Sequence, residues 1–128
     1  MIQERINTLI SCKIGDWVET CKMLPGIVSE IDNKSFTSNI TVFYPDKNEL
    51  GMCSISHCGV HKISEEYAKI LFEIGENVLR TLYDTYINSS NKEWEDVVIK
   101  YFKNNNMAIS TKALKLFNIG ETFKHKLL

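Results

Sequence analysis

Four side chains that can bind a metal or act as nucleophiles lie close together in the sequence: Cys53, His57, Cys58 and His61. Zinc usually takes four Cys or His ligands in a tetrahedral arrangement, often from closely spaced pairs. His57 and Cys58 are adjacent, so it is difficult for both to face one ion. We therefore interpret the cysteines as buried thiols and the histidines as hydrogen-bonded side chains. Zinc is the weaker alternative, and we expect no cofactor.

A catalytic thiol is another chemical use of this cluster. Cys58 would need His57 or His61 as a base, and a further group to orient that base. The sequence has no glycine-rich phosphate loop, no H-E-x-x-H motif and no other catalytic signature. We therefore expect a protein that is not an enzyme.

Aromatic side chains offer a different chemistry, which is recognition. Four of them fall within the N-terminal half: Trp17, Phe36, Phe43 and Tyr44. Such residues usually belong to the core, but they can also stack on bases or anchor a peptide. Trp17 and Tyr44 each have a polar tip and lie beside a predicted loop. Together with His57 and His61, they are the predicted partner-binding residues.

Charge is unevenly distributed, although the net charge is only −1. Residues 64–96 carry 3 − 8 = −5, and residues 97–128 carry 6 − 1 = +5. The C-terminal lysines are Lys100, Lys103, Lys112, Lys115, Lys124 and Lys126. They could bind phosphates, but we favour packing beside the acidic helices, because only two arginines are present and arginine is the usual phosphate and base reader.

An internal repeat links residues 68–76 to residues 113–121, which share Ala, Leu, Phe, Ile, Gly and Glu in register. Both copies fall on predicted helices. Glycine within a helix costs roughly 1 kcal/mol relative to alanine, so close packing should offset that cost. The repeat therefore predicts that Gly75 and Gly120 are helix-packing positions.

The segment from Ile14 to Ser64 must position most of these side chains, and it reads as a small, strongly bent antiparallel sheet. Alternating residues predict strands at 17–22, 27–31, 36–44, 52–55 and 59–63. Turn residues separate the strands, and residues 46–51 are predicted to form a polar loop. We expect the sheet to close into a barrel.

The segments Gly15–Val18, Pro25–Ile31, Ile40–Tyr44 and Gly59–Ile63 carry a resemblance to a known family. Their order and composition resemble the SH3-like small barrels of the KOW type. The resemblance covers residues 14–63. It implies a module that binds protein or nucleic acid, usually without catalysis.

Helical periodicity appears on both sides of the sheet. Ile2, Ile6, Leu9 and Ile10 share one face of a short N-terminal helix that ends near Cys12. After the sheet, Ser64 is a predicted N-cap for one long helix that runs to about residue 87. A capping box at Ser90 and Glu93 starts the next helix, which ends at residues 104–106. Ser110 or Thr111 caps the last helix.

These elements define an α+β protein with an N-terminal helix, an SH3-like small antiparallel β-barrel and a C-terminal helical unit. We divide the chain into residues 1–64 and 65–128, packed as one compact unit. The hydrophobic content of 44% supports a folded core, and neither a membrane span nor a signal peptide is visible. We therefore expect a cytoplasmic protein with reduced cysteines.

The most favoured function is a small, non-catalytic binding protein whose partner is another protein, compatible with a phage or mobile-element accessory factor. Homo-oligomers through the apolar helices are compatible with the sequence, and membrane binding is not expected. One alternative is a nucleic-acid-binding module that uses the barrel and the C-terminal lysines. Another is a binder of a small anionic ligand, such as a nucleotide.

Overall fold

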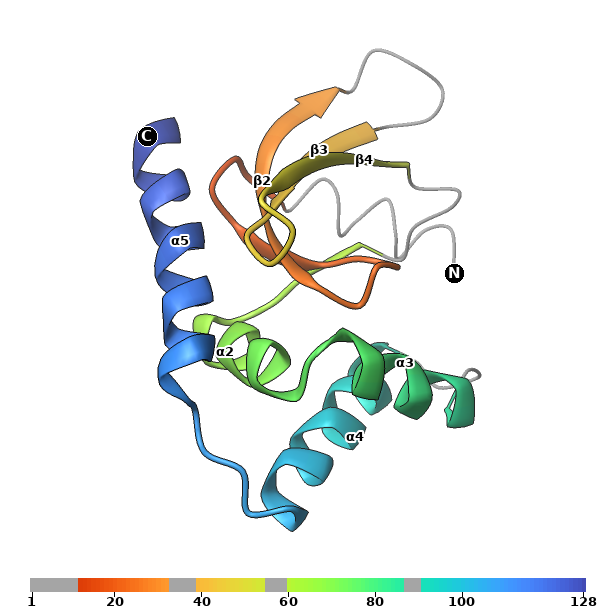
Figure 1. Ribbon diagram of the computed structural model, residues 1–128. Helices are drawn as coiled ribbons and strands as arrows, with labels where there is room; N and C mark the ends of the chain where they lie inside the picture. Colours follow the sequence, from red (N-terminus) through yellow and green to blue (C-terminus); the bar gives the residue numbers. More distant parts are fainter. Residues whose placement is uncertain (1–11, 33–38, 55–59, 87–90) are drawn as a thin grey trace.

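The computed structural model describes residues 12–32, 39–54, 60–86 and 91–128. These residues form an α+β fold in which a five-stranded antiparallel sheet is followed by four helices (Figure 1). The α+β class predicted from the sequence is therefore confirmed. No helix in these ranges combines the length and the apolar character needed to cross a membrane.

The sheet has the strand order β4-β3-β2-β1-β5. Its strands are β1 (Trp17–Glu19), β2 (Pro25–Asp32), β3 (Asn39–Tyr44), β4 (Glu49–Ser54) and β5 (His61–Lys62). Strands β1 to β4 pair in succession, and β5 then returns to pair with β1, with Val18 opposite Lys62. The alternation of apolar and polar residues thus predicted the antiparallel sheet correctly.

Closure of this sheet into a barrel is not shown. In the described residues the sheet is open, with β4 and β5 as its two edges. A register shift between Val28 and Glu30 bends β2 where it pairs with β3. The predicted N-terminal helix and Phe36 lie outside the described ranges.

The polar loop predicted at residues 46–51 is shorter than expected. Strand β4 begins at Glu49, which pairs with Tyr44. The chain reverses tightly because Asn48 adopts a φ of 52° and the Lys47 amide donates to the Tyr44 carbonyl over 3.1 Å. The first two residues of this edge strand, Glu49 and Leu50, are both exposed, so no alternation of buried and exposed side chains marks the start of the strand in the sequence.

The two faces of the sheet contribute to different apolar clusters. One cluster lies within the bend of the sheet and includes Val18, Val28, Val42 and Cys53. The other joins the sheet to the helices, and from the sheet side it includes Trp17 and Ile27. The side chains of neighbouring residues of β1 therefore lie on opposite faces of the sheet. Because both faces are covered, Trp17 and Val18 are both buried.

Four helices follow the sheet: α2 (Glu65–Ile74), α3 (Glu76–Thr85), α4 (Asn91–Asn104) and α5 (Thr111–Leu127). The prediction of one helix from Ser64 to about residue 87 is wrong, because Gly75 interrupts it with a φ of 88°. This left-handed backbone region is accessible mainly to glycine. A Cβ at Gly75 would have no neighbour within 4 Å, so Gly75 makes a helix junction and not the close helix contact that was predicted.

Helix ends follow the capping residues of the sequence. The side chain of Ser64 accepts a hydrogen bond from the Tyr67 amide, and that of Ser110 accepts one from the Ala113 amide. The predicted end of α4 also holds, since Asn106 has a φ of 51°. Ser90 of the predicted capping box lies outside the described residues.

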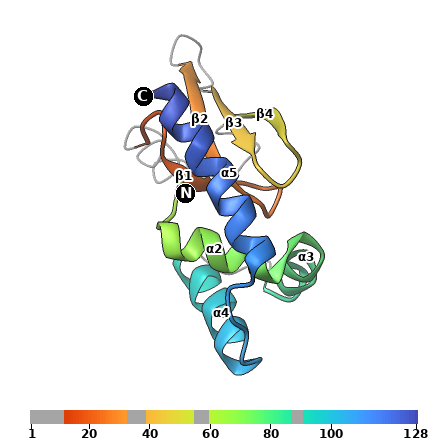
Figure 2. The same ribbon diagram turned by 60° about the vertical axis from the view of Figure 1, so that its left-hand side comes forward.

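Helix α5 runs along the sheet, and α2 lies beneath both (Figure 2). Helix α2 contacts β1, β2 and α5 on one side, and it also contacts α3 and α4. The Ser110 amide, which precedes α5, donates to Glu73 of α2 over 2.6 Å. The inner face of α5 therefore packs against the sheet, and its outer face is exposed.

Candidate functional site

Trp17 and Tyr44, which were predicted to bind a partner, do not reach the surface. Trp17 is 3% exposed and Tyr44 is fully buried. Their burial gives no support to a recognition role, because both faces of their strands are covered. The alternative interpretation of these rings as core residues agrees with the structure.

Trp17 is the centre of the contact between the sheet and the two repeat segments. Its ring stacks on Phe117 at 5.1 Å between centroids and meets the edge of Phe72 at 5.8 Å. A Cβ on Gly120 would overlap this indole. Gly120 therefore permits a close approach of α5 to the sheet, whereas the sequence had predicted a position of contact between helices. Within the described ranges, Nε1 of Trp17 is buried without a hydrogen-bond partner.

Tyr44 belongs to a buried polar group inside the bend of the sheet. Its hydroxyl lies 2.9 Å from Thr20 Oγ1 and 3.4 Å from Cys53 Sγ. Burial, followed by the hydrogen bond with Cys53, raises the pKa of Tyr44 above its usual range. Tyr44 is therefore a neutral structural hydroxyl at physiological pH.

A buried carboxylate, Glu19, was missed in the sequence. It is 2% exposed and accepts hydrogen bonds from the Tyr67 hydroxyl at 3.3 Å and from Trp94 Nε1 at 3.0 Å. His61 Nε2 lies 3.2 Å from its Oε1. Burial and the adjacent Glu19 charge raise the pKa of Tyr67. The cluster joins β1 and β5 to α2 and α4, and each of its donors is itself buried or nearly so.

The zinc candidates are only partly described. Cys53 contacts Tyr44, whereas His61 contacts Glu19 in the other cluster, so these two side chains have different neighbours. His57 and Cys58 lie outside the described residues. In the ranges that the structure covers, no group of three or more His, Cys, Asp or Glu side chains is arranged to hold a metal ion.

The C-terminal lysines are divided between two helices. Lys100 and Lys103 lie on α4, and the other four lie on α5. On α5, Lys124 is 3.9 Å from Glu121 and lies over Gly15, whereas Lys115 and Lys126 project from the opposite face. The lysines therefore do not act as one continuous patch, and only part of the set faces a common surface.

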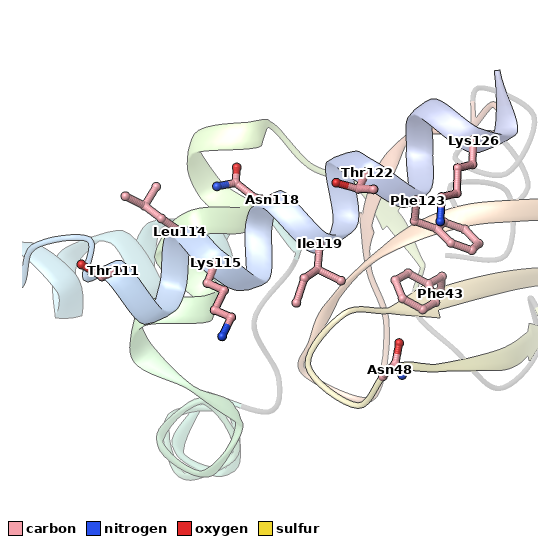
Figure 3. Close-up of a pocket in the computed structure, with 10 residues that line it drawn as sticks. All are labelled: Phe43, Asn48, Thr111, Leu114, Lys115, Asn118, Ile119, Thr122, Phe123 and Lys126. Carbon is pink, nitrogen blue, oxygen red and sulfur yellow. The ribbon is translucent and has the colours of Figure 1, made fainter.

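That surface is a groove between α5 and the turn from β3 to β4, with a volume of about 730 Å³ (Figure 3). Its apolar wall is formed by Phe43, Leu114, Ile119 and Phe123. Ile119 points from α5 to the side where Phe43 and Asn48 lie. Phe43 and Phe123 stack on each other at 4.1 Å between centroids, so this part of the wall joins α5 to the sheet.

The groove is cationic as well as apolar. Lys115 and Lys126 line it, together with Thr and Asn side chains, and none of its described lining residues is acidic. Leu114 is 40% exposed and Ile119 is 37% exposed, which is high for large aliphatic residues of a helix. The volume lies within the range of roughly 300 to 1,000 Å³ that is typical of binding sites.

The groove forms because one face of α5 is buried against the core and the other face is exposed. Ala113, Phe117 and Gly120 are buried against α2 and the sheet. Leu114 and Ile119 are offset from them by about a quarter turn or more around the helix, so they cannot reach that core. In the sequence, α5 has more apolar residues than one buried face can hold, which is a sign of a second apolar surface. Which of its faces is buried could not be identified without the position of Trp17.

Comparisons with protein-family models, with curated proteins and with solved structures found no match for this chain. Its function is therefore inferred from its own residues.

Proposed function

We propose that this protein is a non-catalytic binding module for another protein, and that the groove between α5 and the β3–β4 turn is its contact surface. The observation that carries the proposal is an apolar groove of about 730 Å³ with Leu114 and Ile119 exposed on its wall. Apolar area in contact with water is a cost that a docked partner would remove, at roughly 25 cal/mol per Å².

Protein is favoured over nucleic acid as the partner by the character of the wall. The rings of Phe43 and Phe123 cover one another, so those faces are not available for stacking on bases. Two lysines and no arginine line the groove, whereas base and phosphate recognition leans on arginine. Aliphatic side chains next to aromatic ones are typical of the anchoring pockets of protein interfaces.

An SH3-like barrel remains our proposal for the β unit. It is supported by the return of β5 to β1, which brings the last strand back to the first. It is also supported by the cluster inside the bend, because Cys53 of β4 and Val60 before β5 share that cluster with Val18. A barrel is a sheet closed on itself around its own apolar side chains, so a shared cluster of residues from both edges of the sheet supports this proposal.

The proposal is tested with three immobilised proteins: the wild type, Ile119→Glu in the groove, and Tyr86→Glu as the control. Tyr86 is 42% exposed at the end of α3, away from the groove, so the control makes the same kind of change elsewhere. Each is exposed to a lysate of the source organism, and retained proteins are quantified by mass spectrometry. A purified candidate is then titrated by calorimetry.

We expect a protein that binds the wild type and Tyr86→Glu equally, and Ile119→Glu about 10- to 100-fold more weakly, because one buried aliphatic side chain contributes roughly 1.5 to 3 kcal/mol. Equal binding of the partner by all three proteins would exclude the groove as the contact surface. Retention of nucleic acid alone, with a steep loss of binding as salt rises, would favour the nucleic-acid alternative.

A further inference from the structure

We propose that the groove receives an amphipathic helix of the partner protein, with acidic residues on either side of its apolar stripe. This inference rests on the proposed function and adds the chemical character of the partner. It depends on the spacing of residues along α5, on the charge of the groove and on the geometry of its two walls.

The outer face of α5 has the spacing of a helix-packing surface. Leu114, Asn118, Thr122 and Lys126 follow one another at four-residue intervals, and Lys115, Ile119 and Phe123 form the row beside them. Rows at this interval make the ridges and grooves into which a second helix packs. The Asn and Thr side chains between the apolar ones are short, so a second helix can approach closely along most of α5.

The wall opposite α5 makes the groove suitable for a helix and less suitable for an added strand. Phe43 of β3 and Asn48 of the β3–β4 turn contribute side chains to this wall, and Figure 3 shows them below α5, across from Ile119. A strand would instead require free backbone groups, which in the described sheet lie along the outer edges of β4 and β5, and neither strand contributes a residue to the groove. The occupant of the groove is therefore held by side chains.

Charge indicates the sign and the spacing of the partner residues. Lys115 and Lys126 are 126 − 115 = 11 residues apart, which corresponds to about 16 Å along α5 at a rise of about 1.5 Å per residue. Two carboxylates separated by about three helical turns on the partner would meet both ammonium groups. A complementary pair of this kind favours association and orients the docked helix.

A second copy of this chain fits the groove less well. In a two-fold symmetric dimer, α5 would dock on another α5, and each would bring Lys115 and Lys126 to a surface whose described lining has no acid. The cations would then be partly desolvated without opposite charges nearby. An acidic helix supplies both the apolar stripe and the missing countercharge.

The test is a display selection on the full-length protein from a library of randomised 18-residue peptides. Peptides that also bind Ile119→Glu are removed in each round. We expect the enriched sequences to have apolar residues at i, i+3 or i+4, and i+7, with Asp or Glu about 11 positions apart. The consensus peptide is then titrated by fluorescence anisotropy against the wild type and against the Lys115→Glu/Lys126→Glu double variant.

Reversal of both lysines should weaken the consensus peptide at least tenfold, and a peptide with its two acids changed to lysine should recover binding to the double variant. The Lys100→Glu/Lys103→Glu variant on α4 is the matched control and should bind the consensus peptide as the wild type does. Circular dichroism spectra confirm that each variant is folded.

Enrichment of proline-containing or basic peptides, or no enrichment at all, would overturn the inference, as would a dimer in sedimentation that only Ile119→Glu dissociates. These results differ from failure of the proposed function. If no peptide is selected but a lysate protein still requires Ile119, the helical occupant is wrong and the binding function stands. If neither is found, both proposals fail.

Discussion

Glu19 is the residue whose surroundings most constrain the core. A carboxylate that is 2% exposed would be strongly destabilising without partners, but both of its oxygens are occupied. One accepts from Tyr67 and lies next to His61, and the other accepts from Trp94. Glu19 therefore ties two strands to two helices through charge-assisted hydrogen bonds.

Replacement of this carboxylate leaves buried donors without an acceptor. We expect Glu19→Ala to lower the free energy of unfolding by about 3 kcal/mol, because Tyr67 and Trp94 then lose their partner and a cavity forms. Glu19→Gln should lose less, since it keeps one acceptor oxygen. Urea denaturation followed by circular dichroism measures both changes, and a loss below about 0.5 kcal/mol for Glu19→Ala would contradict this account.

Among the elements, the two repeat segments show how similar helices acquire different roles. Phe72 and Phe117 occupy equivalent repeat positions and both contact Trp17, from α2 and α5 respectively. The glycines that follow them differ, because Gly75 ends α2 whereas Gly120 lies inside α5 against Trp17. Similar local sequence therefore has one outcome where the chain must turn and another where it must pack.

These two glycines should respond differently to substitution. Gly120→Ala places a Cβ 2.7 Å from Trp17 Cζ2, and we expect about 2 kcal/mol of destabilisation after the gain in helix propensity is counted. Gly75→Ala meets no neighbour, and its cost of about 1 to 2 kcal/mol comes from the positive φ.

Two further substitutions separate the mechanisms. Gly75→Asn should be as destabilising as Gly75→Ala, because the backbone of Gly75 (φ 88°, ψ 156°) lies outside the left-handed helical region that asparagine tolerates. Gly120→Ser should be as harmful as Gly120→Ala or more, because the site near Trp17 has no space. Thermal and urea denaturation measure all four variants, and equal stability of Gly120→Ala and the wild type would refute the close contact.

At the scale of the whole molecule, the apolar cluster around Trp17 contains residues of the sheet and of all four described helices. Phe117 of α5 belongs to this cluster, where it is 7% exposed and packs between the sheet and the helices. We expect Phe117→Ala to cost about 3 to 5 kcal/mol and to shift one common unfolding transition. Far-ultraviolet circular dichroism reports the helices and tryptophan fluorescence reports the core.

Coincidence of the two transitions in both proteins would show that residues 1–64 and 65–128 unfold together. Two separate transitions, with only the helical signal shifted by Phe117→Ala, would instead indicate independent units. Ile119→Glu is the control on the same helix, and it should change stability by less than about 0.5 kcal/mol because its side chain faces solvent.

The features that depend on residues close together in the sequence were predictable. Ser64 and Ser110 cap helices because their side chains reach amides three residues ahead, and the strands follow their alternating residues. Glu19 was not predictable, since a charged residue in an alternating strand resembles a solvated one. The groove was not predictable either, because the exposed face of α5 is determined only when Gly120 meets Trp17.

That meeting of Gly120 and Trp17 has a consequence for recognition. With the indole seated against its backbone, α5 can neither roll about its axis nor slide along the sheet without a steric clash, so the residues it displays have a fixed registration. Under the proposed binding function, the core beneath α5 would therefore set the partner specificity of its outer face. Substitutions that do not contact the partner, such as those that change the size of the aromatic stack beneath the helix, would then change which partners bind.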